Sequence, residues 1–261
     1  MPRIPRIAAV VTAALIGLGA PAVPAAAIVG GNTTEATGYP WLAAIGTPLF
    51  FPRPSGQFCG GALIAPDRVL TAAHCVASAR LLPQALTVTF GRADLRSHDG
   101  VTVGVKEIRV HPDFRDTEFD GETVHHDNLA ILILDEPRPG PYLEVAAPQS
   151  NTASPSDAGA PGTTGTVLGW GATSEDDLSN ALLRSATVPV VPDSTCAAAY
   201  GSAFDPADML CAGSTDADTA EFDSGGPLLV AGRLLGLTSW GKGSARPGFP
   251  GVYTRITTLT F

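Results

Sequence analysis

Short apolar stretches separated by turn-forming residues recur along most of this chain. Each stretch is rich in Val, Ile, Leu and Thr and is bounded by Gly, Pro, Asp or Ser. This pattern predicts short β-strands, at 86–90, 101–105, 129–134, 166–169 and 234–239. No segment keeps a helical repeat beyond a turn or two, and the best short helix is predicted at 194–200, capped by Asp193 or Ser194. The chain is therefore expected to be mainly β.

The first 27 residues have the layout of an export signal. Arg3 and Arg6 precede an apolar stretch at 7–20, and three alanines end at Ala27. This order predicts a signal peptide (1–27) that is cleaved after Ala27, and hence a secreted protein. The apolar stretch is too short and too closely followed by prolines to span a membrane, so no membrane anchor is expected.

The remaining residues, 28–261, are enough for one large β domain or two small barrels that share a cleft. The chain has 25 acidic and 16 basic side chains, a formal charge of −9. Loss of Arg3 and Arg6 with the export signal makes the balance more negative still. This charge disfavours nucleic acid as a partner.

Four cysteines lie in the exported part of the chain, where disulfides are favoured over metal ligation or redox chemistry. They allow three pairings, and their grouping in sequence favours Cys59 with Cys75 and Cys196 with Cys211. Each bond would close a loop of roughly 15 residues and stabilise by about 3 kcal/mol. We expect neither a metal ion nor a cofactor.

Four local motifs occur in a fixed order: IVGG from Ile28, TAAHC from Thr71, DSGGP from Asp223 and SWG from Ser239. Together with the cysteines, they resemble the trypsin and chymotrypsin family of serine proteases, especially the secreted bacterial trypsins. The resemblance implies an all-β fold of two six-stranded antiparallel barrels with the active-site cleft between them. We expect the first barrel at 28–137, a linking segment at 138–165 and the second barrel at 166–261. A stretch with three prolines, 47–57, is expected to extend a hairpin loop near the cleft.

The resemblance also assigns catalytic roles. A serine hydroxyl is a poor nucleophile until an adjacent imidazole takes its proton, and the matching residues are Ser224 and His74. The backbone amides of Phe222 and Ser224 would form the oxyanion hole. A new N-terminal ammonium on Ile28, exposed by signal cleavage, would pair with the carboxylate of Asp223.

The substrate pocket follows from the same alignment. Asp218, six residues before Ser224, matches the pocket floor that receives a substrate Arg or Lys, and Gly241 and Gly251 would keep the pocket open. The backbone of Ser239, Trp240 and Gly241 would pair with an extended substrate. The alternative is that Asp216 and Asp218 merely belong to an acidic, solvated loop.

The string HHDNLAILILDEP departs from the family, because its Asp and Asn stand in inverted order. Ungapped counting puts Asn128 where the family has the aspartate that orients the histidine, whereas a one-residue bulge would return Asp127 to that site. An amide there favours the wrong tautomer of His74, a change that lowers turnover by about 10⁴ in a related protease. His125 and His126 are expected to be loop residues rather than additional bases.

Phe222 is the second departure, because the family carries glycine there. If its amide points into the cleft, activity survives with altered selectivity on the leaving-group side. If the amide turns away, one oxyanion donor is lost, and this loss lowers the activity by about 10²-fold or more. Two functions follow: a secreted endopeptidase that cleaves after Arg or Lys, or a weak or inactive homologue that binds proteins. We expect a monomer whose partners are protein or peptide substrates and protein protease inhibitors. A lipase or esterase is disfavoured, since no αβ alternation frames Ser224.

Overall fold

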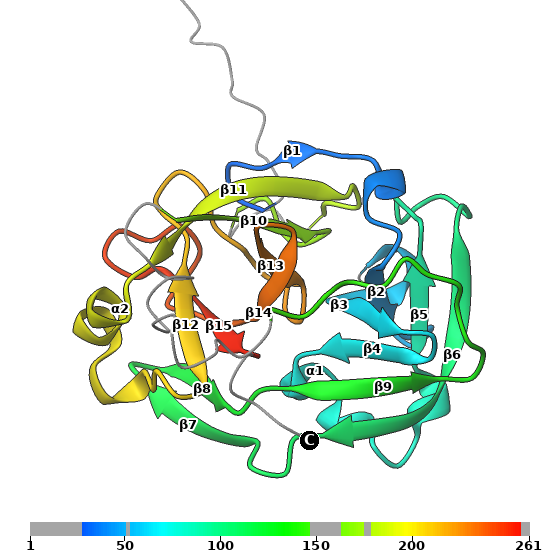
Figure 1. Cartoon of the computed structure of the whole chain (residues 1–261), viewed down its shortest axis with the longest axis horizontal. Helices are drawn as coiled ribbons and strands as arrows, with labels where there is room; N and C mark the ends of the chain where they lie inside the picture. The colour runs from blue at the N-terminus through cyan, green and yellow to red at the C-terminus, as the bar shows by residue number, and fades with distance from the viewer. Residues whose placement is uncertain (1–27, 51–52, 147–162, 175–178, 257–261) are drawn as a thin grey trace, which may run out of the picture.

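Two closed barrels of six antiparallel strands each lie side by side, as a computed structural model of the chain shows (Figure 1). The structure describes residues 28–50, 53–146, 163–174 and 179–256. The predicted signal peptide and most of the predicted linking segment lie outside these residues. The predicted all-β class and two-barrel architecture are confirmed.

The first barrel has the strand order β2-β3-β4-β9-β6-β5 and closes between β5 and β2. Its strands are β2 (Leu42–Gly46), β3 (Gln57–Ala65), β4 (Arg68–Thr71), β5 (Thr87–Phe90), β6 (Val101–Val110) and β9 (Ala130–Leu134). Burial alternates along β9, as expected for a strand with one face on a core. The short helix α1 (Ala73–Val76) follows β4 directly.

The second barrel has the order β11-β10-β13-β14-β15-β12 and closes because β12 also pairs with β11. Its strands are β10 (Thr164–Gly169), β11 (Arg184–Val191), β12 (Met209–Ala212), β13 (Pro227–Val230), β14 (Arg233–Trp240) and β15 (Gly251–Arg255). The two-residue strand β1 (Asn32–Thr33) adds to the edge of β11. The five apolar runs of the sequence thus lie in or overlap β5, β6, β9, β10 and β14.

The predicted helix is present as α2 (Asp193–Tyr200), but its predicted cap is wrong. Pro192 holds the cap position, and Asp193 is the first helical residue. The carboxylate of Asp193 instead accepts a hydrogen bond of 2.7 Å from Arg255, at the end of β15. Among the described residues, no helix is both long and apolar enough to cross a membrane.

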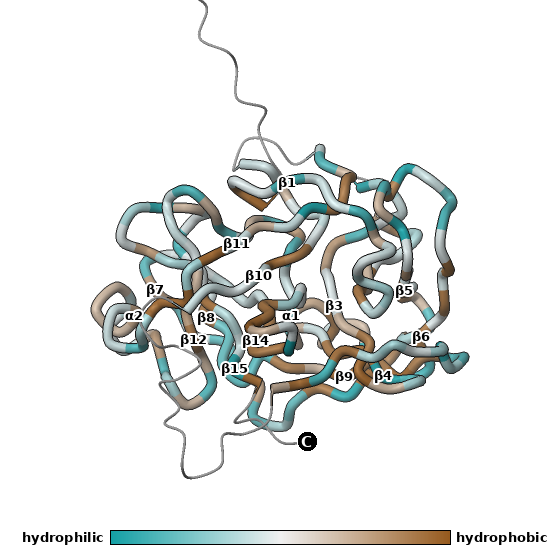
Figure 2. The backbone as a smooth tube through the Cα atoms, turned by 45° about the horizontal axis from the view of Figure 1, so that its top comes forward, coloured by the Kyte–Doolittle hydropathy of each residue, from teal (hydrophilic) through white to brown (hydrophobic). Residues whose placement is uncertain are grey.

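Three of the four apolar clusters among the described residues hold this arrangement together, and apolar segments run along the packed strands such as β4, β9 and β14 (Figure 2). One cluster fills each barrel. A third joins the two, since Leu42 and Leu70 of the first barrel pack with Leu168, Trp170 and Leu237 of the second. Burial of each such side chain stabilises by about 1.5–3 kcal/mol, so the barrels are held in one relative position.

A hairpin outside both barrels, β7 (Arg115–Phe119) and β8 (Glu122–His126), lies below the second barrel in Figure 1. It belongs by sequence to the first barrel, between β6 and β9, yet β8 contacts β14 of the second barrel. The hairpin therefore crosses one edge of the space between the barrels.

Candidate active site

A cleft of about 720 Å³ contains the two residues that the sequence pairs for catalysis. His74 comes from α1 in the first barrel, and Ser224 comes from the turn that precedes β13 in the second. The carbonyl of Ser224 accepts a hydrogen bond of 2.8 Å from the Gly60 N–H on β3. The next residue, Gly225, has φ 76° and donates its N–H to Thr238 of β14. The turn that carries Ser224 is thus tied to both barrels.

Behind His74 lies Asn128, not Asp127. Asn128 is fully buried, its Oδ1 accepts the backbone N–H of His74 at 2.9 Å, and its Nδ2 lies 2.8 Å from His74 Nδ1. The same Nδ2 donates to Ser239 Oγ at 2.7 Å. The orientation of the amide is fixed, because a backbone N–H can only donate and therefore requires the amide oxygen.

This orientation decides the tautomer of His74. Since Asn128 presents an N–H group to Nδ1, that ring nitrogen must accept, and the proton of the neutral ring resides on Nε2. Burial, with a contribution from His125, lowers the pKa of His74 to about 3. The ring is therefore neutral near pH 7. Its acceptor nitrogen, Nδ1, faces Asn128, and Nε2 already carries a proton, so in this tautomer Nε2 cannot act as the base toward Ser224.

The alternative placement, with Asp127 brought to His74 by a bulge, is not the one that the structure shows. Asp127 adopts a left-handed conformation, φ 47°, and its carboxylate pairs with Arg115 at 2.8 Å. Its backbone N–H donates to the buried carboxylate of Asp208 at 2.8 Å. The left-handed turn directs Asp127 to the hairpin and leaves the site behind His74 to Asn128.

His125 and His126 lie at the end of strand β8 rather than in a loop. The ring of His125 stacks on that of His74, with centroids 4.2 Å apart and planes inclined by 13°. His125 Nδ1 bonds to Asp116 Oδ1 at 2.7 Å, across the β7–β8 pairing. His125 also lines the cleft, so it is a site residue that the sequence did not indicate.

Phe222 and Ser224, whose amides are predicted to form the oxyanion hole, both line the cleft. Phe222 has φ 71°, a conformation that glycine adopts freely and a bulky side chain rarely does. The Glu221 carbonyl, on the far side of the peptide from the Phe222 N–H, accepts a hydrogen bond of 2.8 Å from Ala172. Because carbonyl and N–H point in opposite directions across a trans peptide, the Phe222 N–H is directed away from Ala172.

Asp218 lies behind the wall of the cleft and is 1% exposed, so it is not part of a solvated loop. Its carboxylate accepts hydrogen bonds from the N–H groups of Thr219, at 2.8 Å, and Ala245, at 3.0 Å. Burial raises the pKa of Asp218 to about 7. A Cβ on the cleft residue Gly251 would lie 2.6 Å from Asp218 Oδ1, so only glycine leaves the carboxylate within reach of the cleft.

The other predicted substrate-binding residues, Ser239, Trp240 and Gly241, also line the cleft, at the end of β14 and just beyond. Asp223 is buried, and its carboxylate accepts hydrogen bonds from Gly171, at 2.8 Å, and Ala220, at 3.1 Å. Ile28 is buried as well, but it is an internal residue of this uncleaved chain. Its pairing with Asp223 after cleavage stays a prediction.

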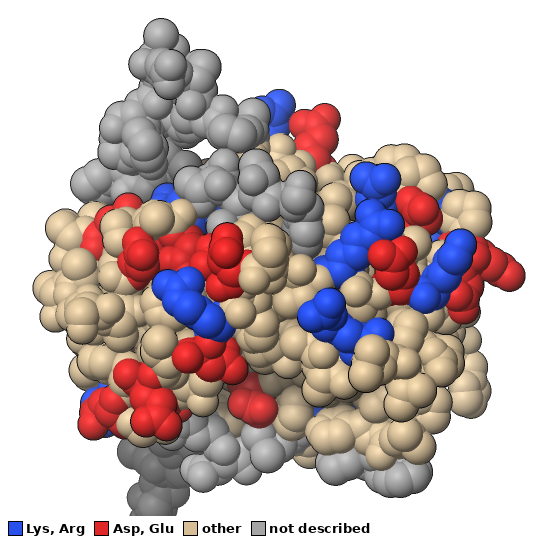
Figure 3. All heavy atoms as spheres, turned by 90° about the horizontal axis from the view of Figure 1, so that it is seen from below, with Lys and Arg blue, Asp and Glu red and all other residues tan. Residues whose placement is uncertain are grey.

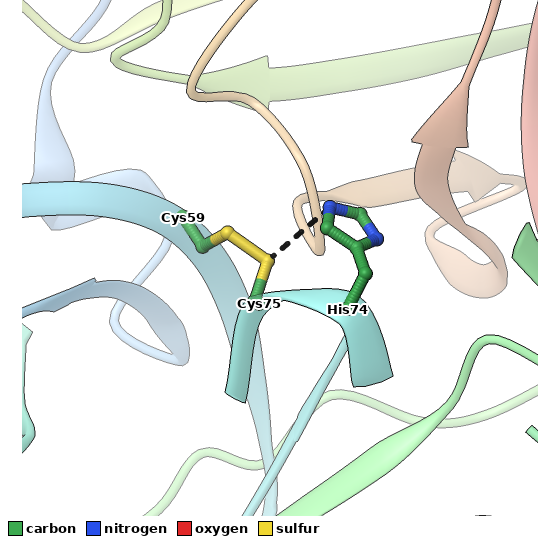
Figure 4. A group of neighbouring side chains, drawn as sticks. All are labelled: Cys59, His74 and Cys75. Carbon is green, nitrogen blue, oxygen red and sulfur yellow. Dashed lines mark hydrogen bonds between the residues drawn. A yellow bond between two sulfur atoms is a disulfide. The ribbon is translucent and has the colours of Figure 1, made fainter. Parts of the chain in front are cut away.

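Both predicted disulfides are present, Cys59–Cys75 and Cys196–Cys211. The first lies beside His74, whose Nε2 is 3.7 Å from Cys75 Sγ (Figure 4). Because both sulfur atoms are used in the disulfide, this cluster offers no thiolate to a metal ion.

Comparison with known proteins agrees with this geometry. The sequence model of the Trypsin family matches residues 28–260. A trypsin from Saccharopolyspora erythraea is 41% identical over 88% of this chain and 93% of its own length. Trypsin eta of Drosophila erecta is 34% identical over 93% of this chain and 91% of its own.

A third relative, mouse Serine protease 56, is 35% identical over 88% of this chain, which spans only 37% of that longer protein. Such proteases act on protein substrates, and the region that the family model matches includes both barrels and the cleft described above. This chain belongs to the trypsin family of serine proteases.

Proposed function

We propose that this chain is a secreted endopeptidase that cleaves after Arg or Lys through an acyl-enzyme. Ser224 attacks the substrate carbonyl, His74 takes its proton, and the amides of Phe222 and Ser224 receive the negative charge on the oxygen. His74 then gives the proton to the leaving amine, and water hydrolyses the ester on Ser224. Asn128 limits the turnover, because it favours the Nε2-protonated tautomer of His74, whereas only the less populated Nδ1-protonated tautomer accepts the proton.

The observation that carries the specificity is the position of the Asp218 carboxylate. The carboxylate is buried directly behind Gly251, and Gly251 lines the same cleft as His74 and Ser224. A buried carboxylate with two backbone donors gains from a cationic partner, because an opposite charge favours its ionised form. The cation of a substrate Arg or Lys would supply that partner.

Acidic side chains around the cleft support a basic substrate. Glu122 and Glu221 line it, and exposed acidic residues occur throughout the β7–β8 hairpin. The face in Figure 3 shows acidic side chains gathered over its left half, the side on which this hairpin lies in Figure 1. This charge would raise the local concentration of cationic peptides.

The test compares kcat/KM for two peptide substrates that differ only in P1 Arg or P1 Phe. We expect a preference for P1 Arg in the parent and its loss in Asp218→Ser. Asp216→Ser is the matched control, since Asp216 is exposed and should leave the preference unchanged. Equal processing of both substrates by the parent would contradict the proposed specificity.

The buried amide of Asn128 also favours a second function, in which the chain binds proteins in its cleft with little or no catalysis. The two functions differ in one simple assay. A protein inhibitor of trypsins would bind in either case, but only an active protease cleaves a peptide with P1 Arg and loses that activity in Ser224→Ala.

A further inference from the structure

Phe222 has a left-handed backbone conformation, φ 71°, which a bulky side chain disfavours. The proposed mechanism uses the amide of this same residue. A left-handed phenylalanine persists only where its surroundings hold it.

Several residues hold Phe222, among them Phe50, whose ring centroid lies 6.1 Å from that of Phe222. The preceding peptide is fixed by the bond from Ala172 to the Glu221 carbonyl, at 2.8 Å. The Phe222 carbonyl accepts a hydrogen bond of 2.9 Å from Gln57 Nε2. The Phe222 ring lies under the guanidinium of Arg53, whose Cζ is 4.5 Å from the ring centroid.

Arg53 and Gln57 form one buried unit. They are 4% and 1% exposed, and Arg53 Nη2 donates to Gln57 Oε1 at 2.8 Å and to the Trp170 carbonyl at 2.6 Å. Arg53 lies in the proline-containing loop that leads into β3 of the first barrel and Gln57 is the first residue of β3, whereas Phe222 belongs to the second barrel. The buried guanidinium of Arg53 therefore contacts the ring of Phe222, and the buried amide of Gln57 contacts its carbonyl.

We propose that Arg53 is a positioning residue for the oxyanion hole: with Gln57, it clamps Phe222 in the left-handed conformation that directs its N–H into the cleft. The planar guanidinium fixes the ring, and thus the direction of the Cα–Cβ bond, while Gln57 fixes the following carbonyl. With the preceding peptide also fixed, rotation about φ of Phe222 would break at least one of these contacts. Arg53 further offers a positive charge near Asp223, where it opposes the rise in the pKa of that carboxyl caused by burial.

The proposal rests on the proposed function, because it assumes that the Phe222 amide receives the oxyanion. Two kinds of ligand distinguish a failure of this proposal from a failure of the proposed function. A peptide aldehyde forms a hemiacetal with the serine and places its oxygen in the oxyanion hole. Benzamidine fills only the pocket for the basic side chain.

The experiment measures equilibrium inhibition by acetyl-Leu-Leu-argininal and by benzamidine in the parent and in Arg53→Met. Methionine keeps an unbranched apolar stem but has neither the charge nor the planar group. We expect the aldehyde to bind about 10²-fold more weakly, the size of effect seen for loss of one oxyanion donor, and benzamidine to change less than about twofold. Arg53→Lys should lose part of the aldehyde affinity, because an ammonium cannot stack as a plane.

The decisive comparison repeats Arg53→Met in a Phe222→Gly background. Glycine takes a positive φ without support, so the loss of aldehyde affinity should shrink to below about threefold there. Arg92→Met is the matched control, since Arg92 is also buried but donates to Ser55 and to the Asp99 carbonyl. It should leave the ratio of the two affinities unchanged, and circular dichroism verifies that each variant is folded.

Several results would overturn the clamp. These are an equal loss of both ligands in Arg53→Met, the same loss of the aldehyde in the Phe222→Gly background, or an unchanged aldehyde affinity. A parent that binds a phenylalaninal peptide but not benzamidine contradicts the Arg or Lys specificity alone, and the clamp is then tested with phenylalaninal. A parent that binds neither aldehyde contradicts both, because a formed oxyanion hole must accept the hemiacetal.

Discussion

Replacement of Asn128 by aspartate should strongly increase turnover. In the parent, the Asn128 amide donates to Ser239 and faces His74 Nδ1 with its second N–H. Aspartate has the same shape and puts a carboxylate oxygen in place of the amide nitrogen. That oxygen accepts from His74 Nδ1–H, and the Ser239 hydroxyl can rotate to donate instead of accept. The second carboxylate oxygen replaces Asn128 Oδ1 and still accepts the hydrogen bond from the His74 backbone N–H, which is 2.9 Å long in the parent.

The magnitude follows from the tautomer. With Nδ1 protonated, Nε2 becomes the acceptor for the Ser224 proton, and the carboxylate stabilises the imidazolium that forms. We expect kcat to rise by up to about 10⁴, the cost of the reverse change in a related protease, or about 5.4 kcal/mol of transition-state stabilisation.

The assay is steady-state hydrolysis of a P1 Arg peptide amide at pH 8, with kcat and KM determined separately. KM should change little, since Asn128 is fully buried and does not touch the substrate. The acidic limb of kcat/KM provides a second measurement. Burial keeps the pKa of His74 below its ordinary value in the parent, whereas a carboxylate beside it favours the charged ring, so the limb should move to higher pH in Asn128→Asp. A kcat within tenfold of the parent would refute the tautomer argument.

Further predictions concern the neighbours of this site. Asp127→Ala should change kcat less than about twofold in the same assay, because the Asp127 carboxylate contacts Arg115 and not His74; a large loss of kcat would show that it supports the histidine. Benzamidine should bind more tightly as the pH rises through about 7, because the pKa of Asp218 is raised to that value by burial and only the ionised carboxylate attracts the cation; an affinity independent of pH between 6 and 8 would contradict this. Phe222→Gly should broaden the preference at the leaving-group positions P1′ and P2′ in a peptide-library digest, since it removes a ring from the cleft wall; an unchanged profile would place the ring outside those subsites. N-terminal sequencing of secreted protein should begin at Ile28, whereas a start at Val23 or Ala26 would require a second protease for activation.

The strands and the disulfides could be predicted because their signals are local. Runs such as 129–134 are bounded by turn residues, and Cys59 and Cys75 are close in sequence. The choice between Asp127 and Asn128 could not be made from the sequence, because it depends on one backbone angle. Asp127, with φ 47°, contacts Arg115 and also Asp208, which lies far along the chain.

The burial of Arg53 and the stacking of His125 on His74 could not be predicted from the sequence for a related reason. A proline-flanked arginine in a loop ordinarily faces solvent, and its burial over Phe222 depends on a contact between the two barrels. The pairing of His125 with Asp116 arises from the register of a hairpin that sequence did not predict. The doublet His125–His126 next to the inverted Asp–Asn pair was the one available signal, and it did not distinguish a strand from a loop.

If the proposed function is right, Ser224 is the nucleophile of a working protease site. The most direct measurement is labelling of the purified protein by a peptidyl diphenyl phosphonate with P1 Arg, followed by mass spectrometry of the modified peptide. We expect one covalent adduct on Ser224, formed faster in Asn128→Asp and absent in Ser224→Ala. No adduct in either the parent or Asn128→Asp, or an adduct that persists in Ser224→Ala, would contradict it.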